Sequence, residues 1–232
     1  MAQAREIQVG MENSPLYIHE HHDVCDPITG RVMTGSWVWD SALILSHYIT
    51  TRAYHEHDFS LQGKTVLELG AGLGLPGLTA SKLGARRVIL TDLGPLLQGL
   101  RHNVDANRLS DRVEVCELVW GTNELPNQLK GSKGGVDVVL MSDVLYDPSL
   151  MGPLAKTLNM VCGSETLIWS ASEVRDSTSE CLCQLTSHGF EVTELPKQFI
   201  QHSLCDMETS NNNHIDNFGV YLIRPLKQMC SP

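Results

Sequence analysis

Short apolar runs alternate with longer polar-apolar stretches along most of the chain. The runs are rich in Val, Ile and Leu and have strand length, whereas most stretches between them reach ten residues with helical spacing. Strands are predicted at 64–69, 86–92, 112–120, 136–146, 165–172, 190–196 and 218–224. Helices are predicted at 40–54, 76–84, 94–109, 148–162 and 176–189. Because parallel strands need such crossover helices, the pattern predicts a doubly wound α/β fold with a mainly parallel seven-strand sheet.

Both ends of the chain depart from this alternation. Only a polar loop at about 197–217 separates the last two strands, so we expect the last strand to run antiparallel, with the loop as a flexible rim or a substrate-facing element. Near the N-terminus, 16–22 and 28–35 read as two short strands around a turn, which predicts a leading β-hairpin. We expect one domain over 1–232, with this hairpin extension at 1–36 and the core at 37–226.

Composition argues against some classes of partner. The chain of 232 residues has 17 Lys and Arg against 27 Asp and Glu, a formal net charge of −10. Such a field repels a long phosphate backbone, and no Lys/Arg cluster offsets it, so we expect no nucleic acid as partner. No stretch of about 18 consecutive apolar residues occurs and the N-terminus lacks the apolar run of a signal peptide, so we expect no membrane partner.

Cysteine and histidine usage bears on compartment and metals. The seven cysteines are irregularly spaced without a Cys-x-x-Cys pair, which indicates reduced thiols in an intracellular protein. We expect a soluble monomer of the cytoplasm, with the nucleus as the other compartment. His19, His21 and His22 lie near Asp23 and Cys25, all of them residue types that bind metals. In the alternating pattern of this segment they are more typical of the solvent face of a strand, and we predict no metal site.

Four glycines follow the first core strand, in the segment VLELGAGLGLPGL. Gly70, Gly72, Gly74 and Gly77 fall within eight residues, and Pro76 is suited to open the helix that follows. A bare backbone at this place can present N–H groups to a ligand at the carboxyl edge of the sheet. A tight turn alone needs fewer glycines, so the segment favours a bound ligand.

The glycine spacing alone leaves two ligands open. A Gly-x-Gly-x-x-Gly pattern starts at Gly72, and Asp92 lies twenty residues later at the end of the second core strand, where an acid can bind the ribose of a dinucleotide. Counted from Gly70, the first glycine after the strand, the third glycine of that fingerprint falls at Leu75, and this register fails. A nicotinamide-dependent oxidoreductase also needs a proton donor, and the chain has no Tyr-x-x-x-Lys pair.

Several short motifs carry a resemblance to a known family. Glu68 to Gly74, ELGAGLG, resembles the first motif of seven-strand S-adenosylmethionine-dependent methyltransferases. Further matches are Val38-Trp39-Asp40, Leu90-Thr91-Asp92, Val119-Trp120-Gly121 and Ser142-Asp143-Val144-Leu145-Tyr146. Together they resemble methyltransferase family 16, a group of protein lysine methyltransferases with an Asp-x-x-Tyr signature after the fourth strand. The resemblance runs from about Trp37 to Arg224.

The resemblance implies S-adenosylmethionine as the cofactor. The loop glycines would line its methionine and ribose, and Asp92 would accept hydrogen bonds from both ribose hydroxyls. An indole can cover the flat adenine, although Trp39 and Trp120 also fit packing roles. The implied cofactor contacts are Trp39, Glu68, Gly70, Ala71, Gly72, Asp92, Trp120 and Ser142.

Two further residues of the signature are candidates for the transfer step. Methyl transfer to an amine is an in-line displacement, which needs alignment and exclusion of water, and a lysine with a pKa near about 10.4 must first lose a proton. Asp143 would attract the cationic side chain and then accept an N–H of the neutral amine, a positioning role rather than strong-base catalysis. Tyr146 would offer its hydroxyl or ring face. Capping of the next turn by Asp143 and packing of Tyr146 are the alternatives.

We therefore predict a protein lysine methyltransferase whose acceptor is a partner protein. For this signature, the resemblance implies chaperones, ATPases, translation factors and histones as acceptors. A methyltransferase for arginine or a small molecule is the nearest variant, a nicotinamide-dependent oxidoreductase is the rival class, and a catalytically silent binding module is a third. Glu173 and Arg175 lie on the same sheet edge, but a salt bridge or a helix start explains them as well, and they are not assigned to the site.

Overall fold

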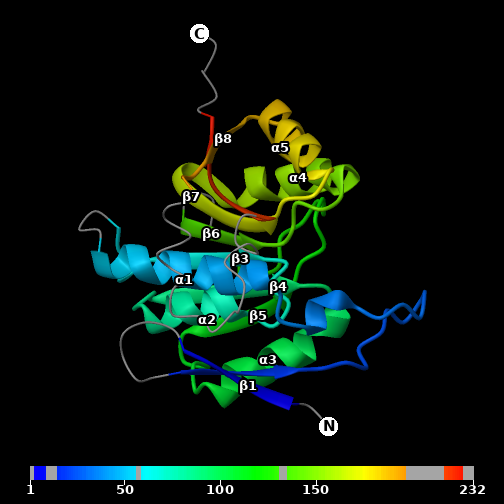
Figure 1. The fold of residues 1–232 in the computed structure, drawn as a ribbon, viewed down its shortest axis with the longest axis vertical. Helices are drawn as coiled ribbons and strands as arrows, with labels where there is room; N and C mark the ends of the chain where they lie inside the picture. Colours follow the sequence, from blue (N-terminus) through cyan, green and yellow to red (C-terminus); the bar gives the residue numbers. More distant parts are fainter. Residues whose placement is uncertain (1–2, 9–14, 56–58, 131–134, 197–216, 227–232) are drawn as a thin grey trace.

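The computed structural model describes residues 3–8, 15–55, 59–130, 135–196 and 217–226 (Figure 1). The loop predicted at about 197–217 lies outside these ranges, apart from Asn217.

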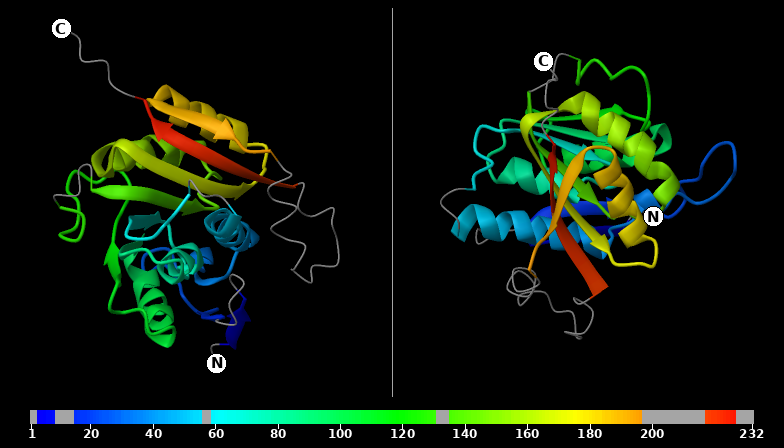
Figure 2. Two further views of the ribbon diagram at one scale, coloured as in Figure 1. Left: turned by 90° about the vertical axis from the view of Figure 1, so that its left-hand side faces the viewer. Right: turned by 90° about the horizontal axis from the view of Figure 1, so that it is seen from above.

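Seven strands form one twisted sheet in the order β5-β4-β3-β6-β7-β9-β8 (Figures 1 and 2). The strands are β3 (Thr65–Leu69), β4 (Arg87–Asp92), β5 (Val113–Glu117), β6 (Val136–Ser142), β7 (Cys162–Glu173), β8 (Phe190–Glu194) and β9 (Phe218–Pro225). Strands β3 to β7 pair in parallel, and β9 lies between β7 and β8 and runs antiparallel to both. The predicted parallel sheet with an antiparallel last strand is confirmed.

Helices cover both faces of the sheet because its strands are apolar on both sides. The helices are α1 (Asp40–His55), α2 (Leu75–Lys82), α3 (Leu97–Ala106), α4 (Met151–Val161) and α5 (Thr178–Ser187). Val66 of β3 packs into the core under α1, α2 and α3, whereas its neighbour Leu67 packs into the core under α4 and α5. Alternate residues of each central strand thus enter opposite cores, which is why these strands read as unbroken apolar runs.

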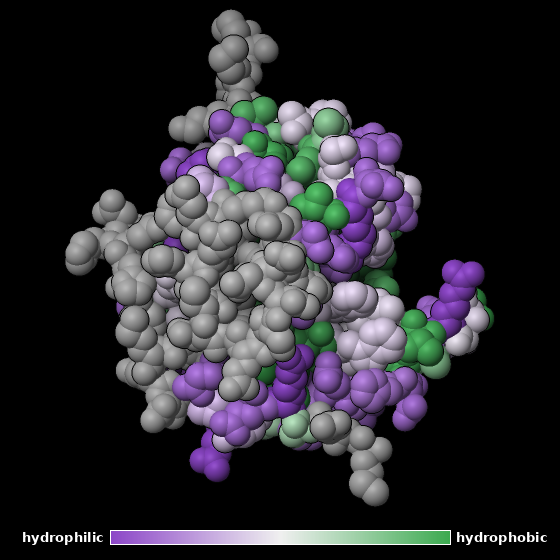
Figure 3. Space-filling model, viewed as in Figure 1, coloured by the Kyte–Doolittle hydropathy of each residue, from purple (hydrophilic) through white to green (hydrophobic). Residues whose placement is uncertain are grey.

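The N-terminal hairpin exists, but one of its two predicted strands is wrong. Strand β2 (Leu16–Glu20) pairs with β1 (Gln3–Ile7), not with 28–35. The latter segment belongs to an arm that protrudes from the body of the molecule and is held by one isolated bridge between Cys25 and Val32 (Figures 1 and 3). The segment packs against little of the body, since Ile28 is 92% exposed, and an isolated ribbon of this kind is too weakly stabilised to form regular strands.

Two asparagines, Asn103 of α3 and Asn107 directly after it, bind the hairpin. Asn103 is fully buried: its Oδ1 accepts the His19 N–H at 2.8 Å, and its Nδ2 donates to the Leu73 carbonyl at 3.2 Å. Asn107 Oδ1 accepts the Tyr17 N–H at 2.9 Å. Asn103 therefore connects the hairpin to the glycine-rich loop after β3, whereas the Asn107 side chain binds the hairpin and the Asn103 carbonyl.

Two classes of feature are absent from the described ranges. They contain no group of three or more His, Cys, Asp or Glu side chains arranged to hold a metal ion; the rings of His19 and His102 instead contact each other, with centroids 4.5 Å apart. No helix in these ranges combines the length and the apolar character needed to cross a membrane.

Candidate active site

A cavity of about 660 Å³ opens at the carboxyl ends of the central strands. The segments that follow β3, β4, β5, β6 and β7 all contribute to its wall, and residues 32–39 close it on the side of the arm. The cavity lies where the chain order reverses between β3 and β6, the place at which open α/β sheets bind ligands. Its size suits a nucleoside-sized molecule.

The structure brings nine of the ten residues predicted for the site into this one cavity. The tenth, Glu68, does not line it. The residues that line it are Trp39, Gly70, Ala71, Gly72, Asp92, Trp120, Ser142, Asp143 and Tyr146.

The glycine loop serves the packing of the chain as well as a ligand. Gly72 has a φ of +53°, and a Cβ on it would lie 2.7 Å from the carbonyl oxygen of Gly35, in the short 3-10 turn Thr34–Ser36. Gly70 has a φ of +65°, and a Cβ there would lie 3.2 Å from Trp120 in the cavity wall. The loop is therefore bare at Gly72 because the protein's own backbone passes there, and at Gly70 because the cavity wall is close.

Asp92 supports the loop and keeps capacity for a ligand. Its Oδ2 accepts the Gly72 N–H at 2.7 Å, and its Oδ1 accepts the Leu93 N–H at 2.7 Å. Burial raises the pKa of Asp92, while these two backbone hydrogen bonds act against that rise. Because each carboxylate oxygen can accept two hydrogen bonds, one position per oxygen is left for a ribose hydroxyl.

Exposed apolar side chains gather in this cavity. Nine large hydrophobic residues of the described ranges are exposed, and five of them line it. These five are Val32, Trp39, Leu93, Val119 and Tyr146. Such a concentration of apolar surface around one hollow marks a site that is covered when a ligand or partner is bound.

Glu68 needs a correction, because its side chain is fully buried below the loop. Its Oε2 accepts the Gly77 N–H of α2 at 2.8 Å, while its Oε1 has no hydrogen-bond partner among the described residues. Burial raises the pKa of Glu68 to about 8. Glu68 thus anchors the first turn of α2 and, contrary to the prediction, does not face the cavity.

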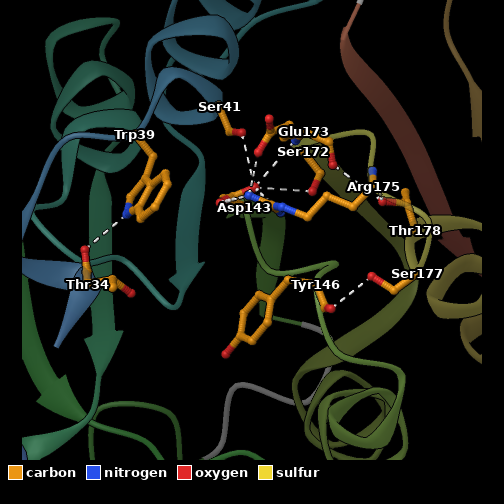
Figure 4. Close-up of polar contacts among 10 residues, drawn as sticks. All are labelled: Thr34, Trp39, Ser41, Asp143, Tyr146, Ser172, Glu173, Arg175, Ser177 and Thr178. Atoms are coloured by element: carbon orange, nitrogen blue, oxygen red, sulfur yellow. Dashed lines mark hydrogen bonds and ion pairs between the residues drawn. The ribbon is translucent and has the colours of Figure 1, made fainter. Parts of the chain in front are cut away.

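Asp143 directly follows β6 and has a left-handed backbone conformation, with a φ of +55°. Arg175 binds its carboxylate with both terminal nitrogens, Nη1 to Oδ1 and Nη2 to Oδ2, each at 2.9 Å (Figure 4). Ser41, Ser172 and the Glu173 N–H donate further, longer hydrogen bonds to Oδ1. A non-glycine residue at positive φ is often found at functional sites.

The alternative role of Asp143 as a helix cap is wrong. The cap of the next turn is Asp147, whose Oδ1 accepts the Ser149 N–H at 2.9 Å. Arg175 is the residue that the sequence interpretation missed: it lines the cavity and pairs with Asp143. The Glu-x-Arg pattern after the fifth core strand was a visible signal, but a local salt bridge explained it equally well.

Tyr146 and Trp39 supply aromatic surface beside Asp143. The Tyr146 side chain is 48% exposed, and its carbonyl accepts the hydroxyl of Ser177 at 2.9 Å (Figure 4). Burial first, and then the charges of Asp147, Asp92 and Asp143, raise the pKa of Tyr146, so its hydroxyl keeps its proton at neutral pH. Trp39 Nε1 donates to the Thr34 carbonyl at 3.0 Å, which fixes the indole at the cavity.

The chain is similar to curated protein lysine methyltransferases. The protein-lysine methyltransferase METTL21E of Mus musculus is 36% identical over 149 residues, which cover 63% of this chain and 59% of that protein. The EEF1A lysine methyltransferase 3 of Xenopus tropicalis is 37% identical over 139 residues, 60% of this chain and 57% of that protein. The matches thus span somewhat under three fifths of each relative's length.

A solved structure supports the fold. The mitomycin 7-O-methyltransferase MmcR matches with a TM-score of 0.56 at 18% sequence identity, over 78% of this chain and 53% of that one. The predicted methyltransferase fold is therefore confirmed.

The family itself follows from a wider match. A family model described as lysine methyltransferase matches residues 27–188, which is more than half of the chain. The resemblance to methyltransferase family 16 is thereby confirmed, and with it S-adenosylmethionine as the cofactor of the family. The chain belongs to the lysine methyltransferase family.

Proposed function

We propose that the protein transfers methyl groups from S-adenosylmethionine to a lysine side chain of a partner protein. The observation that supports this best is the single cavity that joins the glycine loop and Asp92 to the Asp143–Tyr146 segment. A methyltransferase needs both halves in one space, because donor and acceptor must meet in line.

The residues of the first half fit the cofactor. Asp92 has acceptor capacity for the two ribose hydroxyls, and the loop from Gly70 to Gly72 leaves the backbone accessible beside it. Leu93 and Val119 give an apolar wall suited to adenine, next to Trp120. When bound, the cofactor supplies a methyl group on a positively charged sulfur.

The residues of the second half suit an amine. Asp143 Oδ2 accepts one hydrogen bond, from Arg175, and keeps room for an N–H of the acceptor. The Tyr146 ring and the Trp39 indole offer π-faces, which attract ammonium and methylammonium groups. A lysine side chain is long and thin enough to place its amine there while the rest of the partner stays outside.

Methyl transfer is tested with S-adenosylmethionine labelled on the methyl group, added with the protein to a cell extract. We expect a labelled protein band with the parent and its loss in Asp92→Ala and Asp143→Ala. Asp111→Ala is the matched control, since Asp111 is exposed and pairs only with its neighbour Arg112. Absence of the band with the parent, or equal labelling by Asp92→Ala, would refute the proposal.

The acceptor belongs to the same proposal. We infer a protein lysine on a chaperone, an ATPase, a translation factor or a histone; one relative carries EEF1A in its name. Digestion of the labelled band and mass spectrometry identify the residue, and methylarginine or a labelled small molecule would contradict lysine. We propose a monomer that works in the cytoplasm, with the nucleus as a second compartment; fractionation and light scattering test both statements.

A nicotinamide-dependent oxidoreductase fits the structure less well. The antiparallel β9 between β7 and β8 departs from the strand order of the dinucleotide-binding fold. S-Adenosylhomocysteine should raise the melting temperature, and NADH should not, because only a ligand of the folded state stabilises it. A shift with NADH alone would favour the oxidoreductase.

A further inference from the structure

Arg175 is the only cationic side chain among the described residues that line the cavity. It follows β7, and its guanidinium is shared between Asp143, with two contacts at 2.9 Å, and Glu173, with one at 2.8 Å. The Asp143 side chain is only 12% exposed, whereas that of Glu173 is 42% exposed and better screened by water. The contact with Asp143 is therefore the stronger of the two.

The segment that carries Arg175 is fastened at both ends to the Asp143–Tyr146 segment. The Glu173 N–H donates to Asp143 Oδ1, and the hydroxyl of Ser177 donates to the Tyr146 carbonyl. The Arg175 N–H donates to Thr178 Oγ1 at 2.9 Å, which fixes the backbone at the start of α5. The ion pair is thus built into the fold and does not depend on a ligand.

An unpaired carboxylate at this place would hinder the proposed reaction. A lysine amine attacks a methyl group only through its lone pair, which the ammonium form lacks. A buried negative charge next to the amine stabilises the ammonium form and so raises the pKa of the bound lysine. The other acids near the site, Asp92 and Asp147 around Tyr146 and Glu173 beside Arg175, act in the same direction, and the Tyr146 hydroxyl is uncharged.

We propose that Arg175 is a positioning residue that neutralises Asp143, so that the carboxylate orients the acceptor amine without holding its proton. Arg175 makes no contact with the reacting atoms in this scheme. It acts through Asp143, and its effect is a lower pKa of the bound amine. The proposal rests on the function proposed above.

Sinefungin provides a test that needs neither turnover nor an acceptor. This analogue of S-adenosylmethionine carries a primary amine where the cofactor carries its transferable methyl group. S-Adenosylhomocysteine lacks any group there and reports on cofactor affinity alone. The ratio of the two dissociation constants, measured by calorimetry at pH 7, therefore reports how strongly the site favours an ammonium group.

In Arg175→Gln we expect sinefungin to gain roughly tenfold in affinity relative to S-adenosylhomocysteine, the equivalent of about one pKa unit. Arg175→Lys keeps the charge and should keep the ratio of the parent. The double variant Asp143→Asn/Arg175→Gln removes the unpaired carboxylate and should return the ratio. Arg87→Gln is the matched control, because Arg87 makes an equivalent two-point contact with Glu114 outside the cavity and should change nothing.

The rate of methyl transfer gives the second readout. Its pH profile should move to higher pH by about one unit in Arg175→Gln and stay in place in Arg175→Lys, even if the maximal rate falls. A ratio and a profile unchanged in a folded Arg175→Gln variant would overturn the inference while the proposed function stands. If neither ligand binds the parent, the proposed function fails, and the inference with it.

Discussion

At the scale of single residues, Glu68 shows how burial converts a carboxylate into a neutral group. The side chain is fully buried, with one oxygen on the Gly77 N–H and the other without a partner in the described ranges. Burial raises the pKa of Glu68 from its ordinary 4.5 to about 8, so the folded protein holds this proton at neutral pH. The acidic residue of the ELGAGLG motif is therefore uncharged at neutral pH.

The proton on Glu68 makes stability depend on pH. Between pH 4.5 and about 8 the folded protein binds one proton more than the unfolded chain, so the free energy of unfolding should fall as pH rises, by about 1.4 kcal/mol per unit. This contribution is full below pH 4.5 and is lost as pH rises through about 8.

Glu68→Gln keeps an acceptor for Gly77 and removes the titration, so the slope should disappear. Urea unfolding at several pH values between 5.5 and 8.5 measures it. Equal slopes in the parent and the variant would mean that Glu68 is ionised in the folded protein.

The roles assigned to single residues from the sequence met different outcomes. Asp92, the two tryptophans and the loop were found together at one cavity, because their position follows from where the strands end. Arg175 was not assigned to the site because its partner, Asp143, lies 32 positions away in the chain, and the Glu-x-Arg pattern by itself indicates a local salt bridge equally well. Glu68 was misplaced because a residue within a strand faces one core or the other, and the motif does not say which.

At the scale of elements, the glycine loop and the 3-10 turn at Thr34–Ser36 pack backbone against backbone. We expect Gly72→Ala to destabilise the protein by about 2–4 kcal/mol and to weaken S-adenosylhomocysteine binding at least about tenfold, because the new methyl group meets a carbonyl oxygen and the φ is unfavourable. Gly189→Ala is the matched control: its φ is +90°, but nothing lies within 4 Å. Gly189→Ala should lower the stability of the protein and leave its affinity for S-adenosylhomocysteine unchanged. Equal loss of ligand affinity in both would show that backbone strain, not the close approach, is responsible.

Asn103 connects the hairpin to the glycine-rich loop, so its replacement should affect both segments. Asn103→Ala removes the partners of the half-buried His19 N–H and the buried Leu73 carbonyl, which costs about 2–3 kcal/mol, and it should lower the affinity for S-adenosylhomocysteine. Asn107→Ala breaks the two bonds to Tyr17 and one bond to the Asn103 carbonyl, leaves the contact with the glycine-rich loop in place, and should cost about 1 kcal/mol with unchanged affinity. Denaturant unfolding and calorimetry of both variants check this. An affinity unchanged in Asn103→Ala would show that the hairpin does not support the loop.

The order of elements could be read from the sequence, whereas some pairings could not. Strands buried on both faces, such as β3, stand out as apolar runs between amphipathic helices. The partner of β2 was missed because β1 has little apolar pattern in its sequence. The hairpin is also held by the contact of β2 with α3, which the sequence does not reveal. The place of β9 was equally hidden, since a strand with a long loop before it can join either side of its neighbour.

At the scale of the whole molecule, the formal net charge of −10 favours an acceptor whose modified lysine lies in a basic segment. Salt screens such long-range attraction, with a screening length of about 10 Å at 0.1 M. Between roughly 50 and 500 mM KCl, the KM for the acceptor should rise several-fold. The affinity for S-adenosylhomocysteine, which is set by short contacts, should change little. A KM independent of salt would speak against a basic acceptor segment.

The position of β9 has a consequence for biosynthesis. Within the described sheet, β8 pairs with β9 alone, yet β9 leaves the ribosome after every other strand. Until Phe218–Pro225 has emerged, β7 has an unpaired edge and β8 has no strand to pair with. The nascent chain can therefore form the sheet from β5 to β7 but cannot yet add β8. Chains stalled before Phe218 should be cut by protease around β8 while β3 to β6 resist; protection of β8 in such chains would contradict this order of assembly.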